Sequence, residues 1–216
     1  MIFNCCSSFN SIFFQFVLII YIFINTNYIT FHLQLLQNKL IFFMAKKLII
    51  DWKEYNQIVE KLAIQIYDSG FKPNLLIGIM RGGAPIIDVL SRVFKLKCAY
   101  LAVESYSGEN IEDKQGELIF SRELSSTVQE MSGNILLCDD LSDTGVTLNK
   151  SIDWLKKYPP LKGKIKSIKT AVLWKKADST FEPDFCAQKL KDNPWIVQPF
   201  EKYEEIRIED LKKSLK

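Results

Sequence analysis

Short apolar runs alternate with amphipathic stretches along most of the chain. The clearest apolar runs lie at 48–50, 75–79, 97–103, 135–138 and 168–174. Each has the length and the β-branched or aliphatic composition of a buried strand. Because strands that alternate with helices form parallel sheets covered on both faces, the pattern predicts an α/β fold with a mostly parallel central sheet flanked by helices.

The stretch 52–69 shows helical spacing most clearly. Asp51 is placed to cap its amino end, and Gly70 is placed to end it. Apolar residues recur at three- and four-residue intervals, which predicts one face packed on the sheet. That face comprises Tyr55, Ile58, Val59, Leu62, Ile66 and Tyr67.

The remaining elements are shorter or more weakly patterned. Helices are expected at 85–94 and 148–158, and a charged amphipathic helix at 204–216. A hairpin arm is expected over 118–124 and a short strand over 184–187.

The densest candidate chemistry follows the apolar run 135–138. Asp139 and Asp140 end that run, and Asp-Thr-Gly-Val-Thr at 143–147 leads into the next helix. Ligands in open α/β sheets bind beyond the carboxyl ends of the strands, and the unpaired N–H groups of a helix start favour anions. Paired carboxylates would repel a bare phosphate but suit sugar hydroxyls or a hard cation. The stretch predicts a site for a ribose phosphate with Mg²⁺; an ordinary strand–turn–helix with capping side chains is the alternative.

A second loop follows the run 75–79, where Met80-Arg81-Gly82-Gly83 precedes a helix. An arginine next to two glycines offers a guanidinium and exposed backbone N–H groups, which suit a diphosphate. A Gly-Gly pair before a helix is also common in plain tight turns.

Composition excludes several classes of function. The net charge of +3 over 216 residues is too small to indicate binding to nucleic acid or to a membrane surface. The five cysteines include no Cys-x-x-Cys pair, so reduced thiols in a cytoplasmic protein are expected. The one histidine, His32, lies outside the motif-bearing region, which excludes a histidine-based triad or zinc site there.

Residues 1–43 differ from the rest, with no charged side chain before Lys39. Their most apolar part, 12–24, is shorter than the roughly 20 residues of a membrane span, and no basic segment precedes it as in a signal peptide. Three interpretations stay open: a mis-assigned or dispensable extension before a natural start at Met44, a membrane anchor, or a signal. The first is favoured, and a membrane role is expected only if this segment is real.

The strand, the paired acids and Asp-Thr-Gly-x-Thr resemble the phosphoribosyl-pyrophosphate (PRPP) loop of the type I phosphoribosyltransferases. The resemblance spans about 48–205 in four separated motifs and is closest to the xanthine–guanine and hypoxanthine–guanine enzymes. It implies the type I phosphoribosyltransferase fold over 44–205, with a small C-terminal hood near 175–201 and a charged tail at 206–216.

The resemblance implies transfer of 5-phosphoribosyl from PRPP to a 6-oxopurine (guanine, xanthine or hypoxanthine), with Mg²⁺ as cofactor and pyrophosphate as the second product. It also implies a cytoplasmic homodimer or homotetramer of purine salvage. The alternative is a non-catalytic, PRPP-binding regulatory module. Such a regulator would be expected to carry a basic DNA-binding element, and none is visible in the sequence.

The resemblance also assigns roles to individual residues. The residues implied to bind PRPP are Asp139, Asp140, Asp143, Thr144, Gly145, Val146 and Thr147. The residues implied to bind pyrophosphate are Met80, Arg81, Gly82 and Gly83. Base binding falls to Lys175, Trp195 and Ile196, and metal binding to Asp140, with Asp139 and Glu201 as further candidates. In the family the pyrophosphate loop often contains a cis peptide, for which Met80–Arg81 is the matching bond.

The catalytic residues implied are Asp143, near purine N7, and Lys175, at the 6-oxo group. Ser105-Tyr106 matches the start of the family's flexible loop, which shields the reacting sugar from water. Two residues depart from the pattern: Val146 stands where relatives often carry Gly or Lys, and Val197 replaces a Glu of the xanthine–guanine enzymes.

Overall fold

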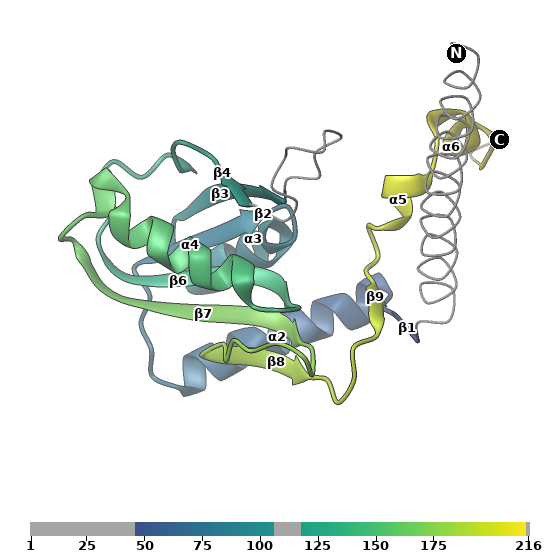
Figure 1. Ribbon diagram of the computed structural model, residues 1–216, viewed down its shortest axis with the longest axis horizontal. Helices are drawn as coiled ribbons and strands as arrows, with labels where there is room; N and C mark the ends of the chain where they lie inside the picture. Colours follow the sequence, from purple (N-terminus) through teal and green to yellow (C-terminus); the bar gives the residue numbers. More distant parts are fainter. Residues whose placement is uncertain (1–45, 106–117, 215–216) are drawn as a thin grey trace, which may run out of the picture. The chain divides into compact units, whose positions relative to one another are not determined.

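The computed structural model describes residues 46–105 and 118–214 (Figure 1). Contacts divide the chain into two compact units, 1–46 and 47–216, and the second contains all the helices and strands described below. Within these described ranges, no helix is both long and apolar enough to cross a bilayer. Residues 1–43 lie outside the described residues, so their three interpretations stay predictions.

The main sheet has seven strands. Six are ordered β4-β3-β2-β6-β7-β8, and β5 pairs separately with β3. Their bounds are β2 Leu75–Met80, β3 Cys98–Ser105, β4 Leu118–Phe120, β5 Ser125–Ser126, β6 Gly133–Ser142, β7 Ile165–Lys175 and β8 Phe185–Lys189. Only β4 and β5 run antiparallel to their neighbour; the other pairings are parallel, which confirms the predicted architecture.

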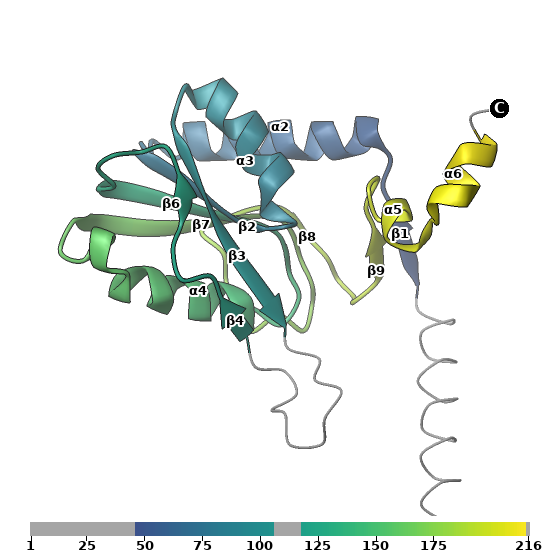
Figure 2. The same ribbon diagram turned by 90° about the horizontal axis from the view of Figure 1, so that it is seen from above.

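Helices cover both faces of this sheet (Figure 2). They are α2 Trp52–Asp68 and α3 Gly83–Phe94 on one face, and α4 Val146–Lys157 on the other, followed by the 3₁₀ turn Pro159–Leu161. Leu136 packs toward α2 and α3, whereas Ile135 and Leu137 belong to the core cluster that includes α4 residues. Because both faces of β6 are covered, its segment 135–138 is continuously apolar rather than alternating.

Helix α2 follows its prediction closely. The Asp51 carboxylate accepts the Glu54 N–H at 2.7 Å, and Gly70 adopts φ +72° just past the helix end. Five of the six predicted core positions are buried, but Tyr67 is 75% exposed. The prediction for Tyr67 was wrong because residue 67 follows Ile66 by a 100° step that carries its side chain out of the buried stripe.

Other boundaries differ modestly from the sequence pattern. Helix α3 begins at Gly83, two residues before the expected start, and β4 ends at Phe120, well short of the predicted arm over 118–124. The charged end forms two short helices, α5 Lys202–Glu205 and α6 Ile208–Ser214, instead of one.

A second, two-stranded sheet joins the two ends of the described fold. Strand β1, Lys47–Ile49, pairs in parallel with β9, Trp195–Val197. The pairing continues beyond β1, where the Ile50 N–H donates to the Val197 carbonyl at 2.9 Å. These strands and α5 lie apart from the main sheet (Figure 2). The word hood is used below for β1, β9 and residues 198–205, whereas the hood that the resemblance implies near 175–201 stays a prediction.

Candidate functional site

The paired acids lie within β6, not at its end. The strand continues to Ser142 because its pairing with β7 extends to Ser142 and Lys175. Asp139 is buried, and its carboxylate accepts the Asp140 N–H at 3.0 Å. Burial, together with the neighbouring charge of Asp140, raises the pKa of Asp139 well above its ordinary value. A bound cation or sugar hydroxyl would therefore relieve an unfavourable burial of negative charge.

Asp140 is the point where three distant stretches meet. A Cβ built on Gly82 would lie 2.4 Å from Asp140 Cγ, so the loop backbone touches this carboxylate. On another side, Gln198 Nε2 of the hood donates to Asp140 Oδ2. Burial, and to a smaller extent the charges of Glu204 and Asp140, raise the pKa of Glu201 above its ordinary value. The loop after β2, the strand β6 and the hood thus converge on one side chain.

The 143–147 turn is fixed by packing as well as by sequence. Gly145 has φ +87°, and a Cβ there would lie 2.2 Å from Phe181 Cβ. The Thr144 carbonyl accepts hydrogen bonds from the Thr180 N–H at 3.3 Å and from the Thr180 hydroxyl at 3.2 Å. Helix α4 starts at Val146, directly after this glycine. The turn therefore presents the start of α4 at the carboxyl end of β6, as expected for an anion site.

Two adjacent lysines at the end of β7 have different partners. Lys175 Nζ lies 3.6 Å from Glu182, whose second carboxylate oxygen contacts Lys189. Lys176 is buried, and its Nζ lies 3.1 Å from the exposed carboxylate of Asp143. Both lysines directly follow the apolar run 168–174 in the sequence, but that pattern does not predict the Lys176–Asp143 pair. Their position directly after an apolar strand was the only signal available.

The pyrophosphate-loop candidate has its own unexpected partner. The Met80–Arg81 peptide is cis, as the resemblance implies. The Arg81 guanidinium donates to Glu204 of α5 at 2.7 Å, with both side chains largely exposed. A Cβ on Gly83 would lie 2.4 Å from the Cys138 carbonyl oxygen, so this glycine lets α3 pack closely on β6.

The hood supplies an aromatic surface. Trp195 is 44% exposed, and its indole N–H donates to Glu201 at 3.3 Å. The next residue, Ile196, is buried and pairs with Leu48 of β1. The exposed ring is thus held by a strand pairing on one side and a side-chain hydrogen bond on another.

Ser105 and Tyr106 were predicted site residues, and Tyr55 was predicted only as a core residue. Ser105 ends β3, whereas Tyr106 lies outside the described residues. Tyr55 was expected only as core, but its buried hydroxyl has no hydrogen-bond partner in the described part of the chain. Burial, and to a smaller extent the charge of Asp140, raise the pKa of Tyr55 above its ordinary value.

The donor set suits a magnesium ion that arrives with a phosphate ligand. Asp139, Asp140 and Glu201 offer only oxygen atoms, which hard cations prefer. Across residues 46–105 and 118–214, no three His, Cys, Asp or Glu side chains are placed to hold a metal ion by themselves. Magnesium is usually bound by one or two carboxylates plus substrate phosphates and water, so this incomplete set fits such binding.

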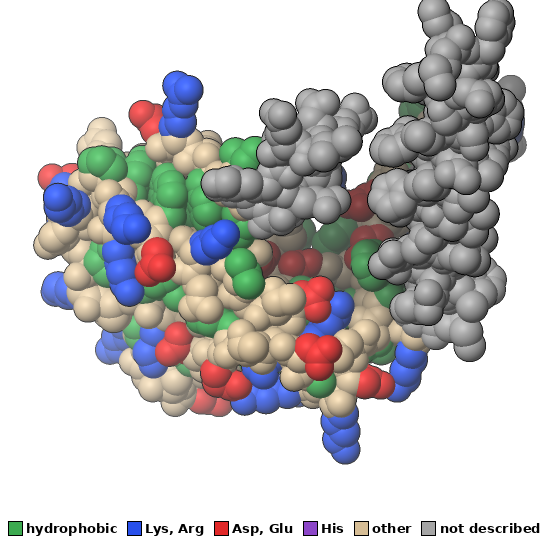
Figure 3. All heavy atoms as spheres, in the orientation of Figure 1, with side chains coloured by type: hydrophobic (Ala, Val, Ile, Leu, Met, Phe, Trp, Pro, Cys, Tyr) green, Lys and Arg blue, Asp and Glu red, His purple; other side chains and the backbone are tan. Residues whose placement is uncertain are grey.

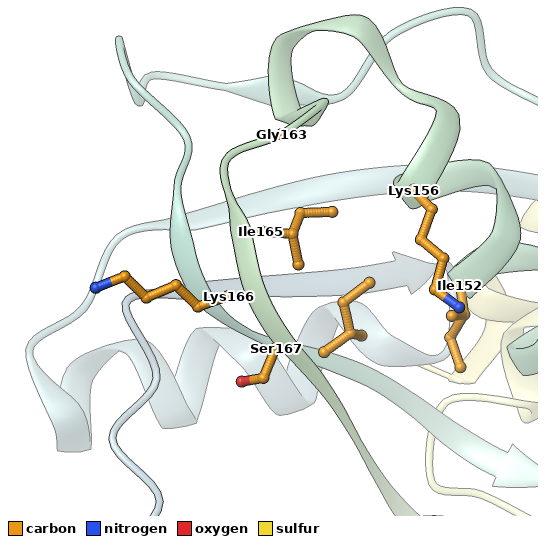
Figure 4. A pocket seen from close by; sticks show the side chains of 7 residues that line it. Ile152, Lys156, Gly163, Ile165, Lys166 and Ser167 are labelled. Atoms are coloured by element: carbon orange, nitrogen blue, oxygen red, sulfur yellow. The ribbon is translucent and has the colours of Figure 1, made fainter.

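The acidic residues of the candidate site lie in a different part of the molecule from the pocket at the start of β7. Acidic side chains are visible in the hollow between the main sheet and the hood (Figure 3). A different pocket, lined by Ile152, Lys156, Gly163, Ile165, Lys166, Ser167 and Ile168, lies where β7 begins (Figure 4). Because that pocket is at the amino end of a parallel strand, it is not where ligands of such sheets bind.

Comparisons with solved structures support the same fold. A purine phosphoribosyltransferase from Pyrococcus horikoshii is 25% identical with a TM-score of 0.58, covering 76% of this chain and 97% of that one. The xanthine-guanine-hypoxanthine phosphoribosyltransferase of Helicobacter pylori is 21% identical with a TM-score of 0.58, covering 77% and 99%. A Neisseria gonorrhoeae protein with bound ppGpp is 19% identical with a TM-score of 0.58, covering 79% and 96%. The similarity to the Helicobacter and Neisseria proteins shows only that this chain shares their fold.

A search of curated protein sequences found no match. The family model described as the phosphoribosyl transferase domain, in contrast, matches residues 49–205. That range contains the paired acids, the 143–147 turn, the Arg-Gly-Gly loop and the hood strand β9. The chain therefore belongs to the phosphoribosyltransferase family.

Proposed function

We propose that the protein transfers the 5-phosphoribosyl group from PRPP to a 6-oxopurine and releases pyrophosphate. The observation that carries this proposal is the convergence on Asp140 of the Gly82 backbone and the Gln198 side chain. A transferase must hold a sugar, a leaving diphosphate and a base together, and the three stretches that meet here offer one set of groups for each.

The 143–147 turn would hold the 5′-phosphate. The N–H groups at the start of α4 and the hydroxyls of Thr144 and Thr147 are donors, and the helix dipole favours negative charge there. Val146 is 46% exposed and brings no polar side chain, so the backbone would carry more of the binding.

The leaving group would be held by the loop at 80–83. Met80 and Arg81 begin this loop, and the N–H groups of Gly82 and Gly83 follow them. Asp139 and Asp140 would engage the ribose hydroxyls and Mg²⁺, with Glu201 near enough to assist. When bound, Mg²⁺ would neutralise charge on the departing diphosphate.

The base would lie between the hood and the end of β7. Trp195 would stack on the purine, the backbone of Ile196 would read the C2 position, and Lys175 would donate to the 6-oxo oxygen. Asp143 would accept a proton or hydrogen bond at N7, with its carboxylate held by Lys176.

Ser105 and Tyr106 would begin a loop that shields the reacting sugar carbon. A developing oxocarbenium ion must be kept from water, and Ser105 is the last residue of β3 at the carboxyl edge of the sheet. We expect the enzyme to be a cytoplasmic homodimer or homotetramer, which sedimentation of the purified chain would test.

The test is nucleotide formation by the full chain with PRPP and Mg²⁺, offering guanine, hypoxanthine, xanthine and adenine separately. Asp143→Asn keeps the side-chain shape and should lower kcat roughly 10²–10⁴-fold, the range for loss of a general base. Lys175→Met should raise the KM for the base about 10–100-fold, as for loss of a hydrogen bond from a charged donor.

Each outcome separates the two candidate activities. Nucleotide formed from a 6-oxopurine, and lost in Asp143→Asn, supports the transferase and ranks the bases. Turnover with adenine alone would contradict the 6-oxopurine assignment. Tight PRPP binding without turnover of any base would favour the non-catalytic regulatory module.

A further inference from the structure

We infer that Gln198 of the hood is a positioning residue that fixes the orientation of the Asp140 carboxylate for binding of PRPP with Mg²⁺. The inference rests on the proposed function because it assigns Asp140 to the ribose and metal. It concerns a glutamine that neither the sequence motifs nor the family match assign to any role.

The first observation is the contact itself. Gln198 is 6% exposed, and its side-chain nitrogen Nε2 donates to Asp140 Oδ2. An ionised carboxylate accepts hydrogen bonds and cannot donate, so the amide nitrogen and not the amide oxygen must face it. A hydrogen bond to a charged acceptor is stronger and more directional than one between neutral groups.

The second observation is a contact on another side of the same carboxylate. The Cβ position of Gly82 lies 2.4 Å from Asp140 Cγ and 2.4 Å from Oδ1. The loop backbone therefore limits the carboxylate at Oδ1 while Gln198 holds Oδ2. Between them these two contacts set the direction in which the remaining lone pairs point.

The backbone that carries Gln198 is anchored on both sides. Val197 accepts the Ile50 N–H at 2.9 Å, and the Gln198 carbonyl accepts the Glu201 N–H at 3.1 Å. Two residues further on, the ring of Phe200 packs edge-on against Tyr55 at 5.9 Å. The amide is thus delivered to Asp140 from a fixed position.

The third observation argues against a purely stabilising role. The other amide atom, Gln198 Oε1, is buried and has no hydrogen-bond partner among the described residues. A half-satisfied buried amide costs stability, and an apolar side chain of equal size would avoid that cost. A ribose hydroxyl or a metal-bound water beside Asp140 would give this oxygen its partner.

The experiment compares Gln198→Met with Gln198→Glu and with the control Gln65→Met. Methionine keeps the length of the side chain but removes both polar atoms, and glutamate keeps the shape but removes the donor. Gln65 is a half-buried glutamine of α2 and belongs to none of the three stretches that meet at Asp140. Binding of PRPP with Mg²⁺ is measured by calorimetry, together with Tm, kcat and the KM of each substrate.

We expect Gln198→Met to weaken PRPP binding about 10-fold, as for one charge-assisted hydrogen bond, while its Tm stays the same or rises. Gln198→Glu should weaken binding at least as much, because a second carboxylate then faces Asp140. In both variants the KM of the base should stay within about two-fold of the parent value, because only the PRPP side is affected. Gln65→Met should behave as the parent protein.

PRPP affinity within two-fold of the parent in both Gln198 variants would overturn the inference. A loss of affinity that is matched by a lower Tm would overturn it too, since it would reveal a structural role. If the parent binds PRPP but turns over no base, the proposed transfer reaction fails while the binding comparison still decides the role of Gln198. If the parent does not bind PRPP, both proposals fail together.

Discussion

The 143–147 turn and the hood reach the same site but are attached to the molecule in different ways. The turn is joined to the core through backbone packing of Gly145 on Phe181 and through α4, whose residue Leu148 is buried. The two strands of the hood pair with each other, and the hood is joined to the rest of the fold by side chains: Ile196 and Phe200 pack on the core, and Gln198 and Glu204 form hydrogen bonds. The turn is therefore held by backbone packing, whereas the hood is held by side-chain contacts.

This difference matches what each region would bind. The 5′-phosphate is the same group whichever base reacts, so a rigid phosphate site does not restrict the choice of base. A base must enter, be distinguished and leave as part of a nucleotide, which favours a region held by side-chain contacts that can rearrange. Four substitutions test this contrast, beginning with the largest expected effect.

Gly145→Ala should destabilise the fold by roughly 2–5 kcal/mol, from a left-handed φ and overpacking against Phe181. Gly163→Ala is the matched control, because Gly163 has φ +74° with nothing within 4 Å of its Cβ position. The control should lose only about 1–2 kcal/mol. Urea unfolding measures both, and equal losses would show that the turn is not held by packing.

Gly82→Ala should cost about 1–3 kcal/mol of folding stability, from overpacking against Asp140 alone, because Gly82 has φ −58° and needs no left-handed conformation. The new methyl group would displace the Asp140 carboxylate, and we expect kcat/KM for PRPP to fall on the order of 100-fold, as for a misplacement of about 1 Å. Steady-state kinetics at varied PRPP concentration measures the effect. Unchanged kcat/KM would mean that the loop and Asp140 do not act on one ligand.

Asp139→Asn should stabilise the protein without ligand at neutral pH and raise Tm by roughly 2–4 °C, equivalent to about 1 kcal/mol. Burial raises the folded-state pKa of Asp139 above its unfolded value of about 3.9. Ionisation of Asp139 therefore lowers the free energy of unfolding as the pH rises from the unfolded pKa to the folded pKa. The advantage of the variant should therefore shrink in acid. Thermal melts at pH 4 and pH 7 test this, and a lower Tm at pH 7 would refute it.

Glu204→Gln should have the smallest effect, since the Arg81–Glu204 pair is largely exposed and such pairs contribute about 0–1 kcal/mol. Freed of its partner, Arg81 should bind PRPP up to about five-fold more tightly at low salt, and the gain should vanish at high salt. Glu209→Gln on α6 is the control. A weaker affinity in Glu204→Gln would show that this glutamate supports the site instead of competing for Arg81.

Much of the site could be predicted from the sequence because its motifs are contiguous. Asp139, Asp140 and the 143–147 turn occupy nine consecutive positions at a strand end, and a strand end is where α/β proteins bind ligands. Their roles stay predictions until ligand is bound, but their common location is a fact of the fold. The Gly145 prediction was incomplete, because its contact with Phe181 could not be known from the local pattern.

The partners of these residues could not be predicted in the same way. Gln198 contacts Asp140 across 58 positions, and Glu204 contacts Arg81 across 123. Lys176 was visible as a strand-end lysine, but its burial against Asp143 depends on where β7 lies beside β6. Tyr67 was assigned to the wrong face because helical periodicity alone does not fix the width of the buried stripe.

The sequence by itself determined most strands of the main sheet, most of the buried face of α2 and the position of the 143–147 turn. Each of these depends on the polarity and conformational preference of residues close together in the chain. Only the tertiary structure decided that the hood reaches Asp140 through Gln198 and that the neighbouring Asp139 is buried. Those features arise from parallel pairings that connect distant segments, and their energies depend on burial and on neighbouring charges that exist only once the chain has folded.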